Sequence, residues 1–596
     1  MAHDVKYARR VPMTTEFDPN ESFVSSLCVG RIAENLIFPY PEVRPSEVQT
    51  LKGVVEAVDG FLGDKKDEFP KWDVAGELPQ EIIEQMKEFG LFGLIIPEEF
   101  GGMGLSTTGY SRTLQQMVRH DASCALTVGA HLSIGMKGLL LYGSKEQKEK
   151  YLPKLCSGEM LAAFCLTEAG AGSDAASIKT KAEQVGDHWI LTGEKIWITN
   201  GGIADFFTVF AATKGEHGKM SAFIVTRDMP GVTTGAHENK MGIRASSTTT
   251  VSFNNVRLTQ EHLLGEEGKG FKIAMNILNS GRTGLGGGCV GSMKTLISLT
   301  AKQAKLRKQF NKSLSEFGLI KQKMGQMTID CYVTESVVNM VSGIIDRGSK
   351  DYAIEAAISK IVASEALWRT ADEALQVAAG NGYMKEYPYE QMLRDARINR
   401  IFEGANEILK LFVALTAMST AATVLKDIGN IIKNPASVFN EPIKGFGILA
   451  TYSKRMLTNT VGYGSGTKMT RVHPLLAEQQ VIVEGQTRTV TALVDKLLRR
   501  HGKSIVDKQF ACARLATVII DIYSLCCVLS RVSQAIENKG SEAALREIQI
   551  ARVFGHQANE RIENTLRQVD NNPDELLKEI ADFTFETEKY DWDNLV

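Results

Sequence analysis

The sequence predicts a mainly helical α+β protein in which a β domain is inserted between two helical regions. Three observations support this fold class. Helix-type periodicity covers Ser46–Tyr151. Segments rich in β-branched and aromatic residues, separated by turns, follow from about Leu161. The helical period then returns from Gly270 to about Ala422, and a further helical domain follows near the C-terminal end.

The predicted boundaries divide the 596 residues into six parts. These are an N-terminal tail (1–35), an N-terminal helical domain (36–160), a β domain (161–270), a helical bundle (271–425), a linker (426–475) and a C-terminal helical domain (476–596). Met1–Thr15 lacks the apolar region of a secretory signal, so we expect a tail or a processed end there.

Each domain has its own local signals. In the first helical domain, Glu81–Phe89 and Tyr110–Met117 show helical periodicity, and a turn is predicted at Pro97–Gly102. The β domain is predicted to be antiparallel with short strands, because its segments are separated by Gly, Asn and Asp turns. The predicted strand segments are His188–Asn200, Phe206–Ala212, Ser221–Arg227 and Thr248–Phe253.

The linker region is basic, in contrast to the rest of the chain. Ile431–Val472 carries six Lys and Arg residues and one Glu, so this stretch is +5 and the remainder of the chain is −7. Phe446, Leu449, Tyr452 and Met456 fit one helical face, which could lie on an anionic membrane. An ordinary linker docked on the protein is an equally good interpretation. Beyond it, Ala511–Ser530 is very apolar but contains Arg514 and Asp521, which predicts a buried helix.

Composition excludes several functional classes. The net charge of −2 argues against a nucleic-acid-binding protein, which needs a surplus of Lys and Arg. The nine cysteines form no CxxC pair or His/Cys cluster with metal-ligand spacing. We therefore expect a reducing compartment and no metal site.

Three motifs carry possible chemistry. In RDARINRIFEGANEIL (Arg394–Leu409), Glu403-Gly404 lies at a helix junction, where a carboxylate can act as a general base or be merely solvated. FCLTEAGAGSD (Phe164–Asp174) is a Gly- and hydroxyl-rich turn that could bind an anion or a heterocycle edge, or be a plain loop. Trp197 and Thr199 could share one face of a strand and cover a flat cofactor, although a lone Trp more often packs into a core.

In this order and spacing, the motifs resemble the acyl-CoA dehydrogenase family over about Leu36–Met418. Further matching segments are Lys148–Pro153, Gly242–Ser246, Gly268–Phe271, Arg307–Phe310 and Gly380–Tyr383. The C-terminal extension, Phe38–Pro41 and Gly129–His131 are similar to the very-long-chain branch of that family. The resemblance implies that the bundle at 271–425 has four helices.

The resemblance also implies an activity and a site. The activity is FAD-dependent α,β-dehydrogenation of a long- or very-long-chain fatty acyl-CoA to trans-2-enoyl-CoA in fatty acid β-oxidation, with Glu403 as the base. The implied FAD-binding residues are Phe164, Cys165, Leu166, Thr167, Ser173, Trp197, Ile198, Thr199, Arg307, Gln309, Phe317, Gly318, Gln376, Gly380, Ala405, Asn406 and Glu407. The implied substrate-binding residues are Ser173, Asn279, Arg282, Phe402 and Gly404.

Partners and location follow from the same resemblance. It implies electron transfer to electron-transferring flavoprotein and a homodimer with FAD sites shared between subunits. It also implies a mitochondrial location, with peripheral association at the matrix side of the inner membrane. Ala405, Ala379 and Asn311 depart from the family pattern near the FAD. These departures keep one alternative open, an assembly protein of respiratory complex I with the same fold. A second alternative is an acyl-CoA oxidase, which shares the chemistry but passes electrons to oxygen.

Overall fold

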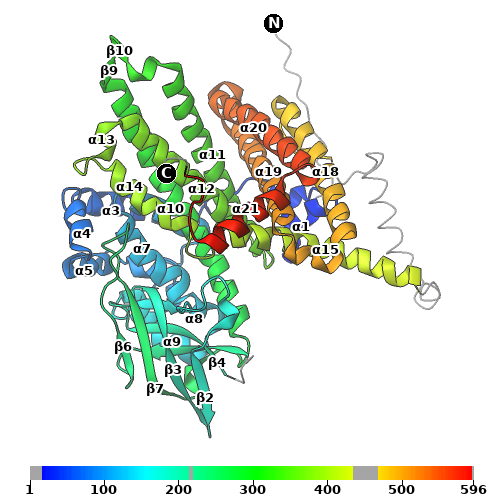
Figure 1. Ribbon diagram of the computed structural model, residues 1–596. Coiled ribbons are helices and arrows are strands. Elements are labelled where there is room, and N and C mark those ends of the chain that lie inside the picture. The colour runs from blue at the N-terminus through cyan, green and yellow to red at the C-terminus, as the bar shows by residue number, and fades with distance from the viewer. Residues whose placement is uncertain (1–16, 214–218, 434–467, 594–596) are drawn as a thin grey trace. The chain divides into compact units, whose positions relative to one another are not determined.

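The computed structural model describes residues 17–213, 219–433 and 468–593 (Figure 1). The chain forms two compact units. Of the described residues, the first unit holds 17–22 and 35–409, and the second holds 23–34 and 410–593. The helical, β, helical order and the extra C-terminal helices confirm the predicted fold class.

Helices make up the first part of unit 1. After α2 (Glu34–Ile37), its main helices are α3 (Val48–Gly63), α4 (Phe69–Ala75), α5 (Gln80–Glu88), α6 (Thr107–Val118), α7 (Ala122–Ala130), α8 (Lys137–Tyr142) and α9 (Lys145–Ser157). Side chains cap several of these helices at their first turns, as at Ser106, Asp121 and Ser144. Short 3₁₀ turns, η1 (Leu91–Gly93) and η2 (Glu98–Phe100), separate α5 from α6, and a π-helical turn, η3 (His131–Gly135), separates α7 from α8.

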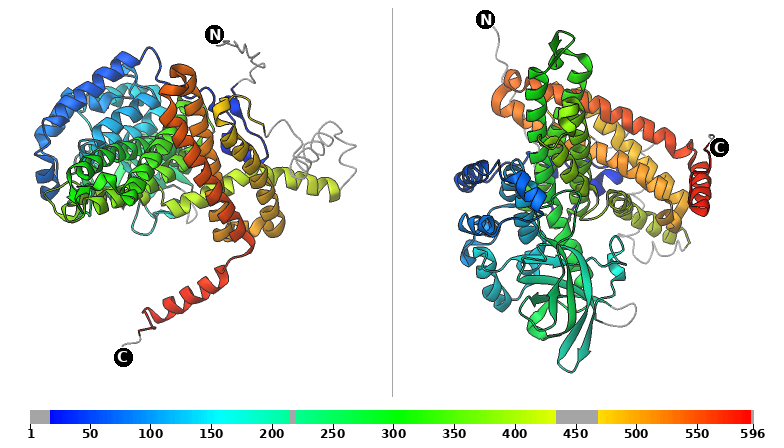
Figure 2. Two further views of the ribbon diagram at one scale, coloured as in Figure 1. Left: turned by 90° about the horizontal axis from the view of Figure 1, so that it is seen from above. Right: turned by 60° about the vertical axis from the view of Figure 1, so that its left-hand side comes forward.

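The β domain is one eight-stranded sheet at one end of unit 1 (Figures 1 and 2). Its strands are β1 (Ala162–Cys165), β2 (Lys181–Val185), β3 (His188–Thr199), β4 (Phe206–Ala212), β5 (Met220–Thr226), β6 (Val232–Thr234), β7 (Thr248–Leu258) and β8 (Leu263–Leu264). Their order is β6-β7-β3-β2-β4-β5-β8, with β1 paired to β4. Phe206 and Phe210 on β4 face the helical core, whereas Phe207 and Val209 face a separate core of the β domain.

The sheet is mixed, which corrects the predicted antiparallel domain. β1 pairs parallel with β4 from Ala162↔Phe206 to Cys165↔Val209, and Lys181 on β2 also pairs parallel with Ala212 on β4. The other pairings are antiparallel. Turn residues in the sequence indicate hairpins, in which strands adjacent along the chain pair antiparallel. In contrast, β1 and β4 are separated along the chain by β2 and β3. The parallel pairing therefore had no local signal.

Long helices complete unit 1. They are α10 (Gly270–Leu306), α11 (Gly318–Asp346), α12 (Ala353–Ala378) and the start of α15 (Asn406–Lys433), with the shorter α13 (Gly380–Tyr383) and α14 (Tyr389–Arg397) between α12 and α15. A small hairpin, β9 (Lys308–Gln309) and β10 (Lys312–Ser313), joins α10 to α11. A Cβ added at Gly291 on α10 would lie 2.2 Å from the Gln115 carbonyl oxygen on α6, so this glycine permits close helix packing.

Unit 2 consists of helices. They are α1 (Phe23–Cys28), the later part of α15, α18 (Ala477–His501), α19 (Gln509–Ala543), α20 (Leu545–Asp570) and α21 (Asp574–Thr587). The predicted tail at 1–35 is wrong for α1, whose Phe23 ring lies 5.8 Å from the Tyr523 ring in α19. The six-residue helix is too short to show a period, and its burial depends on residues far along the chain. The predicted amphipathic segment around Phe446–Met456 lies outside the described residues.

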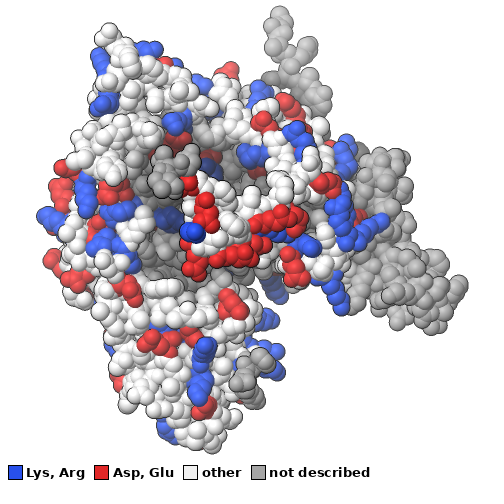
Figure 3. Space-filling model, viewed as in Figure 1, with Lys and Arg blue, Asp and Glu red and all other residues white. Residues whose placement is uncertain are grey.

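Two described helical stretches are long and apolar enough to cross a membrane by length and composition, Ala122–Tyr142 and Gln509–Ala543. Within their most apolar windows, 72% and 78% of residues are buried inside the protein. Burial in the protein core therefore accounts for their apolar character, as predicted for Ala511–Ser530. In contrast, α21 is exposed along its length, and Asp and Glu side chains gather over it (Figure 3).

Candidate active site

Glu403 lies in a strained loop between the 3₁₀ turn η7 (Ile398–Arg400) and α15. Its φ is +54°, and that of Gly404 is +101°. A left-handed conformation costs a residue with a Cβ about 1 kcal/mol or more, and such residues persist where surrounding contacts hold them. The Gly that follows permits the second left-handed residue, so the Glu-Gly pair turns the chain sharply before α15 begins.

The Glu403 carboxylate faces a space left by a glycine. A Cβ added at Gly281 on α10 would lie 3.1 and 3.2 Å from its two oxygens, and 2.9 Å from Ile134 Cγ2. The Oε2 atom is buried, and no group among the described residues donates a hydrogen bond to it. An unsatisfied buried carboxylate oxygen is costly, and in a native protein it commonly marks a functional site. This geometry favours the general-base interpretation over a solvated Glu.

The surroundings of Glu403 adjust its acidity. Burial raises the pKa of its carboxyl to about 7, and the nearby Arg282 and Lys360 charges act in the opposite direction. Arg282 Nε donates to the Glu403 carbonyl oxygen at 3.3 Å, and its Nη1 donates to Asn279 Oδ1 at 2.7 Å. The structure therefore brings Asn279, Arg282 and Glu403 together. A carboxyl with a pKa near neutrality suits proton transfer at physiological pH.

The Gly-rich turn after β1 is organised by a carboxylate that the sequence motifs did not single out. Glu168 accepts hydrogen bonds from the backbone N–H of Lys179 at 2.6 Å and of Thr180 at 3.0 Å, and from Lys195 Nζ at 2.7 Å. Lys195 Nζ also donates to the Leu166 carbonyl oxygen at 3.1 Å, and the Lys195 side chain is fully buried. Lys195 lies on β3 two residues before Trp197, so one buried ion pair ties the turn to that strand. The two-residue period of β3 was the sequence signal that could have indicated a buried Lys195. This residue falls on the same face as the buried Trp189 and Leu191 before the strand bulges.

The turn itself is open. Phe164 and Cys165 lie on β1, and Leu166 is buried, whereas Gly170, Gly172 and Ser173 are exposed. A Cβ added at Gly170 or Gly172 would meet nothing within 4 Å, so the backbone there can be approached closely. Such a turn can present backbone N–H groups to a polar ligand.

Trp197 lies beside this turn in an irregular part of β3. Its φ is +56°, and the register with β7 shifts between Lys195 and Ile198. The Ile196 N–H donates to the Thr167 carbonyl oxygen at 3.0 Å, which joins the two motifs. Trp197 is 63% exposed, so it does not pack into the sheet core, and Ile198 is buried beneath it. An exposed indole next to an open turn can cover a flat ring system.

A second group of expected FAD-binding residues lies far from Glu403 within one chain. Arg307, Gln309, Phe317 and Gly318 lie at or near the β9–β10 hairpin (Figure 1). Arg307 comes 25 residues after Arg282 on α10, which is about 37 Å at 1.5 Å per residue. Gln376 and Gly380 flank Ala379, whose φ is +55°, at the end of α12. One chain therefore does not bring Arg307 and its hairpin neighbours to its own Glu403.

Phe402 and the residues that follow Glu403 lie in or next to the loop of the base. Phe402 and Gly404 lie in the same loop, and Ala405, Asn406 and Glu407 follow at the start of α15. Asn406 is buried and Glu407 is exposed. The Asn406 side chain has four hydrogen-bonded contacts with Lys360, Ser364 and Glu365 on α12, so it fixes the start of α15.

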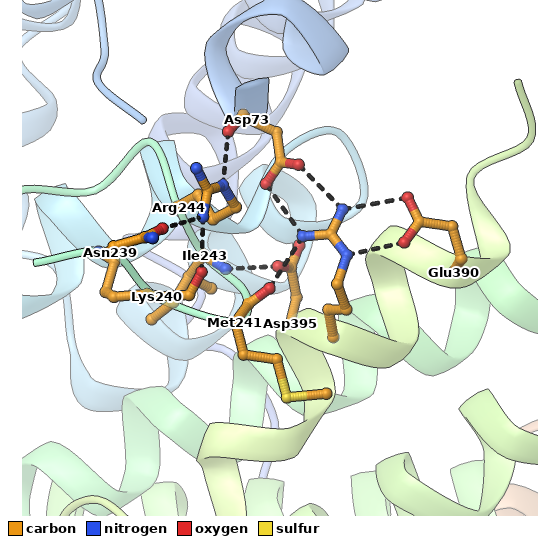
Figure 4. A network of polar contacts seen from close by, with 9 residues as sticks. Asp73, Asn239, Lys240, Met241, Ile243, Arg244, Glu390 and Asp395 are labelled. Carbon is orange, nitrogen blue, oxygen red and sulfur yellow. Dashed lines mark hydrogen bonds and ion pairs between the residues drawn. The ribbon is translucent and has the colours of Figure 1, made fainter. Parts of the chain in front are cut away.

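A polar network, also missed in the sequence, supports the helix that leads to Glu403 (Figure 4). Arg394 on α14 donates to Asp73 on α4 at 2.9 Å and to Glu390 at 2.7 Å. Asp395 accepts the N–H of Ile243, which has a φ of +45°, and burial raises the Asp395 pKa to about 7. The network pins the loop before β7 to α14, six residues before Glu403.

All nine cysteines are free, and the described part of the chain holds no group of three or more His, Cys, Asp or Glu side chains placed to bind a metal ion. The polar groups at Glu403, the open turn and the exposed Trp197 fit an organic cofactor and its substrate. The open backbone and the indole provide surfaces for a flat heterocycle, and the Glu403 carboxylate provides a base.

Sequence profiles of one family cover most of the chain. Residues 49–159, 163–256 and 268–418 match the N-terminal, middle and C-terminal domains of acyl-CoA dehydrogenase. Residues 474–590 match the profile described as ACAD9/ACADV, C-terminal domain. A relative, the very long-chain specific acyl-CoA dehydrogenase, mitochondrial, of Rattus norvegicus, is 42% identical over 93% of this chain and 85% of its own length.

Solved structures show the same similarity. An acyl-CoA dehydrogenase complexed with FAD from Bacillus anthracis has a TM-score of 0.78 and 32% identity, covering 92% of both chains. Butyryl-CoA dehydrogenase from Megasphaera elsdenii has a TM-score of 0.60 and 34% identity, covering 61% of this chain and 97% of its own. The longer match includes the extra C-terminal helices, whereas the shorter one has the length of the first unit.

Proposed function

Because this chain belongs to the acyl-CoA dehydrogenase family, we propose that Glu403 is the base of its reaction and that its substrate is a long- or very-long-chain fatty acyl-CoA. The activity is the FAD-dependent α,β-dehydrogenation of an acyl-CoA to a trans-2-enoyl-CoA. The observation that carries the assignment of Glu403 is its buried carboxylate, with a pKa raised to about 7 and an Oε2 that receives no hydrogen bond from the described residues.

The chain's own groups account for the proton transfer. The Glu403 carboxylate removes the α-proton of the thioester, and Gly281 leaves the space beside its oxygens open to substrate. Arg282 holds the Glu403 carbonyl and so limits rotation of the strained loop. The Glu403 main-chain N–H is then available to stabilise negative charge on the thioester oxygen. FAD supplies the acceptor for the hydride that leaves the β-carbon.

The FAD site is proposed on two surfaces. The turn from Leu166 to Ser173, Trp197 and Thr199 would hold the cofactor close to Glu403. The hairpin residues Arg307, Gln309 and Phe317, with Gln376 and Gly380, would reach the FAD of a second copy, because about 37 Å separates Arg307 from Arg282 along α10. We therefore propose a homodimer with shared cofactor sites.

We base the chain-length proposal on the relatives, because the small residues Gly129, Gly135 and Gly138 could either leave room for an acyl tunnel, as the family resemblance implies, or serve close helix packing. A Cβ at Gly135 would lie 2.8 Å from Ala162, and one at Gly138 would lie 2.9 Å from Ile277. These two glycines thus serve close packing. Gly129 remains a candidate for the acyl tunnel, because a Cβ there would be at an ordinary 3.6 Å from Leu114.

Partners and location complete the proposal. Relatives similar over 93% of this chain are named as mitochondrial, and we propose a mitochondrial location. We also propose electron-transferring flavoprotein as the electron acceptor and peripheral association with the inner membrane. The basic segment that motivates the membrane proposal lies mostly outside the described residues.

The test of the base is Glu403→Gln, assayed for palmitoyl-CoA oxidation with a dye acceptor. Loss of general-base catalysis is expected to lower turnover by about 10³-fold or more, because the amide cannot take the proton. Glu88→Gln, which changes an exposed carboxylate at the end of α5 outside the implied binding residues, is the matched control and should retain turnover. Undiminished turnover in Glu403→Gln would rule out the assignment. Hydrogen peroxide formed without an added acceptor would identify an oxidase instead.

A further inference from the structure

Lys360, in the middle of α12, belongs to no sequence motif, yet it contacts the base loop directly. Its relative exposure is 0%, which is rare for a lysine. Its Nζ donates to the Gly404 carbonyl oxygen at 2.8 Å and to Asn406 Oδ1 at 2.8 Å. Both of these hydrogen bonds therefore end on residues that immediately follow Glu403.

The contacts of α12 hold both sides of the base loop. After the loop, the Asn406 side chain bonds to Lys360 and donates to Glu365 Oε1 at 2.8 Å. Before the loop, Arg400 Nε donates to the same Glu365 oxygen at 3.0 Å. Lys360 and Glu365 thus anchor the chain on either side of the strained Glu403-Gly404 pair.

Two cations from two helices hold two successive carbonyls. Arg282 on α10 donates to the carbonyl oxygen of Glu403, and Lys360 on α12 donates to that of Gly404. Because both residues have positive φ, the loop needs such contacts to keep its conformation. Because peptide groups are planar, holding these two carbonyl oxygens also holds the Glu403–Gly404 and Gly404–Ala405 peptide planes.

The same ammonium also acts on the Glu403 side chain. The ionisable groups that influence Glu403 are Arg282 on α10 and Lys360 on α12, and Glu403 in turn influences Tyr110 on α6 and Cys289 on α10. Only the first two are cations. Burial lowers the pKa of Lys360 to about 8, while Glu403 acts to raise it. At neutral pH a protonated Lys360 favours the ionised carboxylate.

We propose that Lys360 is a positioning residue for the base: it holds the backbone of the Glu403 loop, and its positive charge favours the ionised carboxylate. The inference rests on the proposed function of Glu403. It assigns Lys360 no contact with substrate or cofactor.

The main test is Lys360→Met, which removes the charge and both hydrogen bonds. The midpoint of the pH dependence of kcat/KM is expected to rise by about one pH unit or more, with kcat at neutral pH falling about tenfold. KM for palmitoyl-CoA should change less than about twofold, because Lys360 does not touch substrate. Lys294→Met is the matched control: Lys294 is a partly buried lysine on α10 that contacts Gln115 and Glu335.

Charge and geometry are separated by two further variants. Lys360→Arg keeps the charge and is expected to return the midpoint to within about 0.3 pH unit of the native value. If the midpoint of Lys360→Arg were as high as that of Lys360→Met, the proposed effect of the Lys360 charge on Glu403 would be overturned. Lys360→Gln fills similar space and can still donate to Gly404, so it replaces the Met variant if that variant does not fold. Unshifted midpoints in folded neutral variants would overturn the proposal.

A spectroscopic measurement separates this inference from the proposed function. The Glu403 carboxyl can be titrated by infrared spectroscopy without substrate, as the difference between each chain and the same chain carrying Glu403→Gln. Lys360→Met should raise that titration midpoint relative to the native chain. If the native chain shows no dehydrogenation, the proposed function fails, while a raised infrared midpoint would still support the effect of Lys360 on Glu403.

Discussion

Glu168 and Glu403 are two loop carboxylates with very different surroundings. Glu168 receives hydrogen bonds from two backbone N–H groups and from the buried Lys195 ammonium. Glu403 Oε2 receives none from the described residues, and the nearest cations, Arg282 and Lys360, bond to the backbone of its loop instead. Burial acts to raise the pKa of both. For Glu168 the bonds from Lys195 and the backbone reverse this and lower the pKa, whereas for Glu403 burial prevails.

The difference separates a structural carboxylate from a reactive one. Hydrogen bonds to the charged form stabilise Glu168 as an anion and fix the turn around it. Among the described residues nothing donates such a bond to Glu403 Oε2, so this oxygen is free to take a proton. The protein thus holds the backbone of Glu403 firmly and leaves its side chain under-stabilised.

The largest expected effect comes from breaking the Glu168 pair. Lys195→Met would leave the Glu168 charge without its buried partner, which is expected to lower the free energy of unfolding by about 3–5 kcal/mol. Thermal and urea unfolding measure this change. The exposed Lys179→Met, in the residue that donates only its backbone N–H to Glu168, is the control and should cost less than about 0.5 kcal/mol. Equal stabilities of the two variants would contradict the structural role.

Removing the reactive carboxylate is expected to stabilise the fold. Because the pKa of Glu403 is raised in the folded protein, ionisation of its carboxyl group disfavours the folded state. The protonated carboxyl group therefore stabilises the fold fully below its ordinary pKa, and this contribution is lost as pH rises through about 7. At pH 8, Glu403→Gln should therefore gain about 2 kcal/mol of unfolding free energy, and near pH 5 much less. Urea unfolding at both pH values measures this. Glu168→Gln should instead be destabilised near neutral pH, because its folded pKa is lowered. If Glu403→Gln and Glu168→Gln were both destabilised at neutral pH, the proposed difference between the two carboxylates would be contradicted.

The pH dependence of the native enzyme is the next effect in size. Since Glu403 must be ionised to remove a proton, kcat/KM is expected to rise about tenfold per pH unit below about pH 7 and to level off above it. Steady-state kinetics between pH 5 and about 8.5 measure the profile. A profile that stays flat down to pH 5 would show that Glu403 is stabilised as an anion, as Glu168 is.

The smallest expected effect concerns the space beside the base. Gly281→Ala would place a methyl group 3.1–3.2 Å from the Glu403 oxygens and 2.9 Å from Ile134 Cγ2. We expect kcat to fall about tenfold, equivalent to about 1.4 kcal/mol, because the carboxylate must shift. Gly288→Ala on the same helix would meet only Val118 Cγ2 at 3.3 Å, and it should keep nearly native kinetics. Similar losses in both variants would point to a general effect on α10.

How far the sequence predicts this site depends on the distance between interacting residues. Glu403, the turn at Thr167–Ser173 and Trp197 were found because each lies in a short, continuous motif. Lys195 and Lys360 were not, because their partners lie 27 and 44 residues away. The period of two along β3 places Lys195 on a buried face, but nothing local identifies its partner. Asp395 and Ile243, 152 residues apart, form the extreme case.

The sequence by itself determined the order of helical and β domains and the buried apolar helix around Ala511–Ser530, because periodicity is a local property. It also made Glu403 the candidate base, through the resemblance of its motif to the family. Only the tertiary structure decided the parallel pairing of β1 with β4, the packing of Phe23 on Tyr523 and the cations that hold the Glu403 loop. These features depend on which surfaces meet after the chain folds. The acidity of Glu403 belongs with them, because burial and neighbouring charges, rather than the residue type, set its pKa.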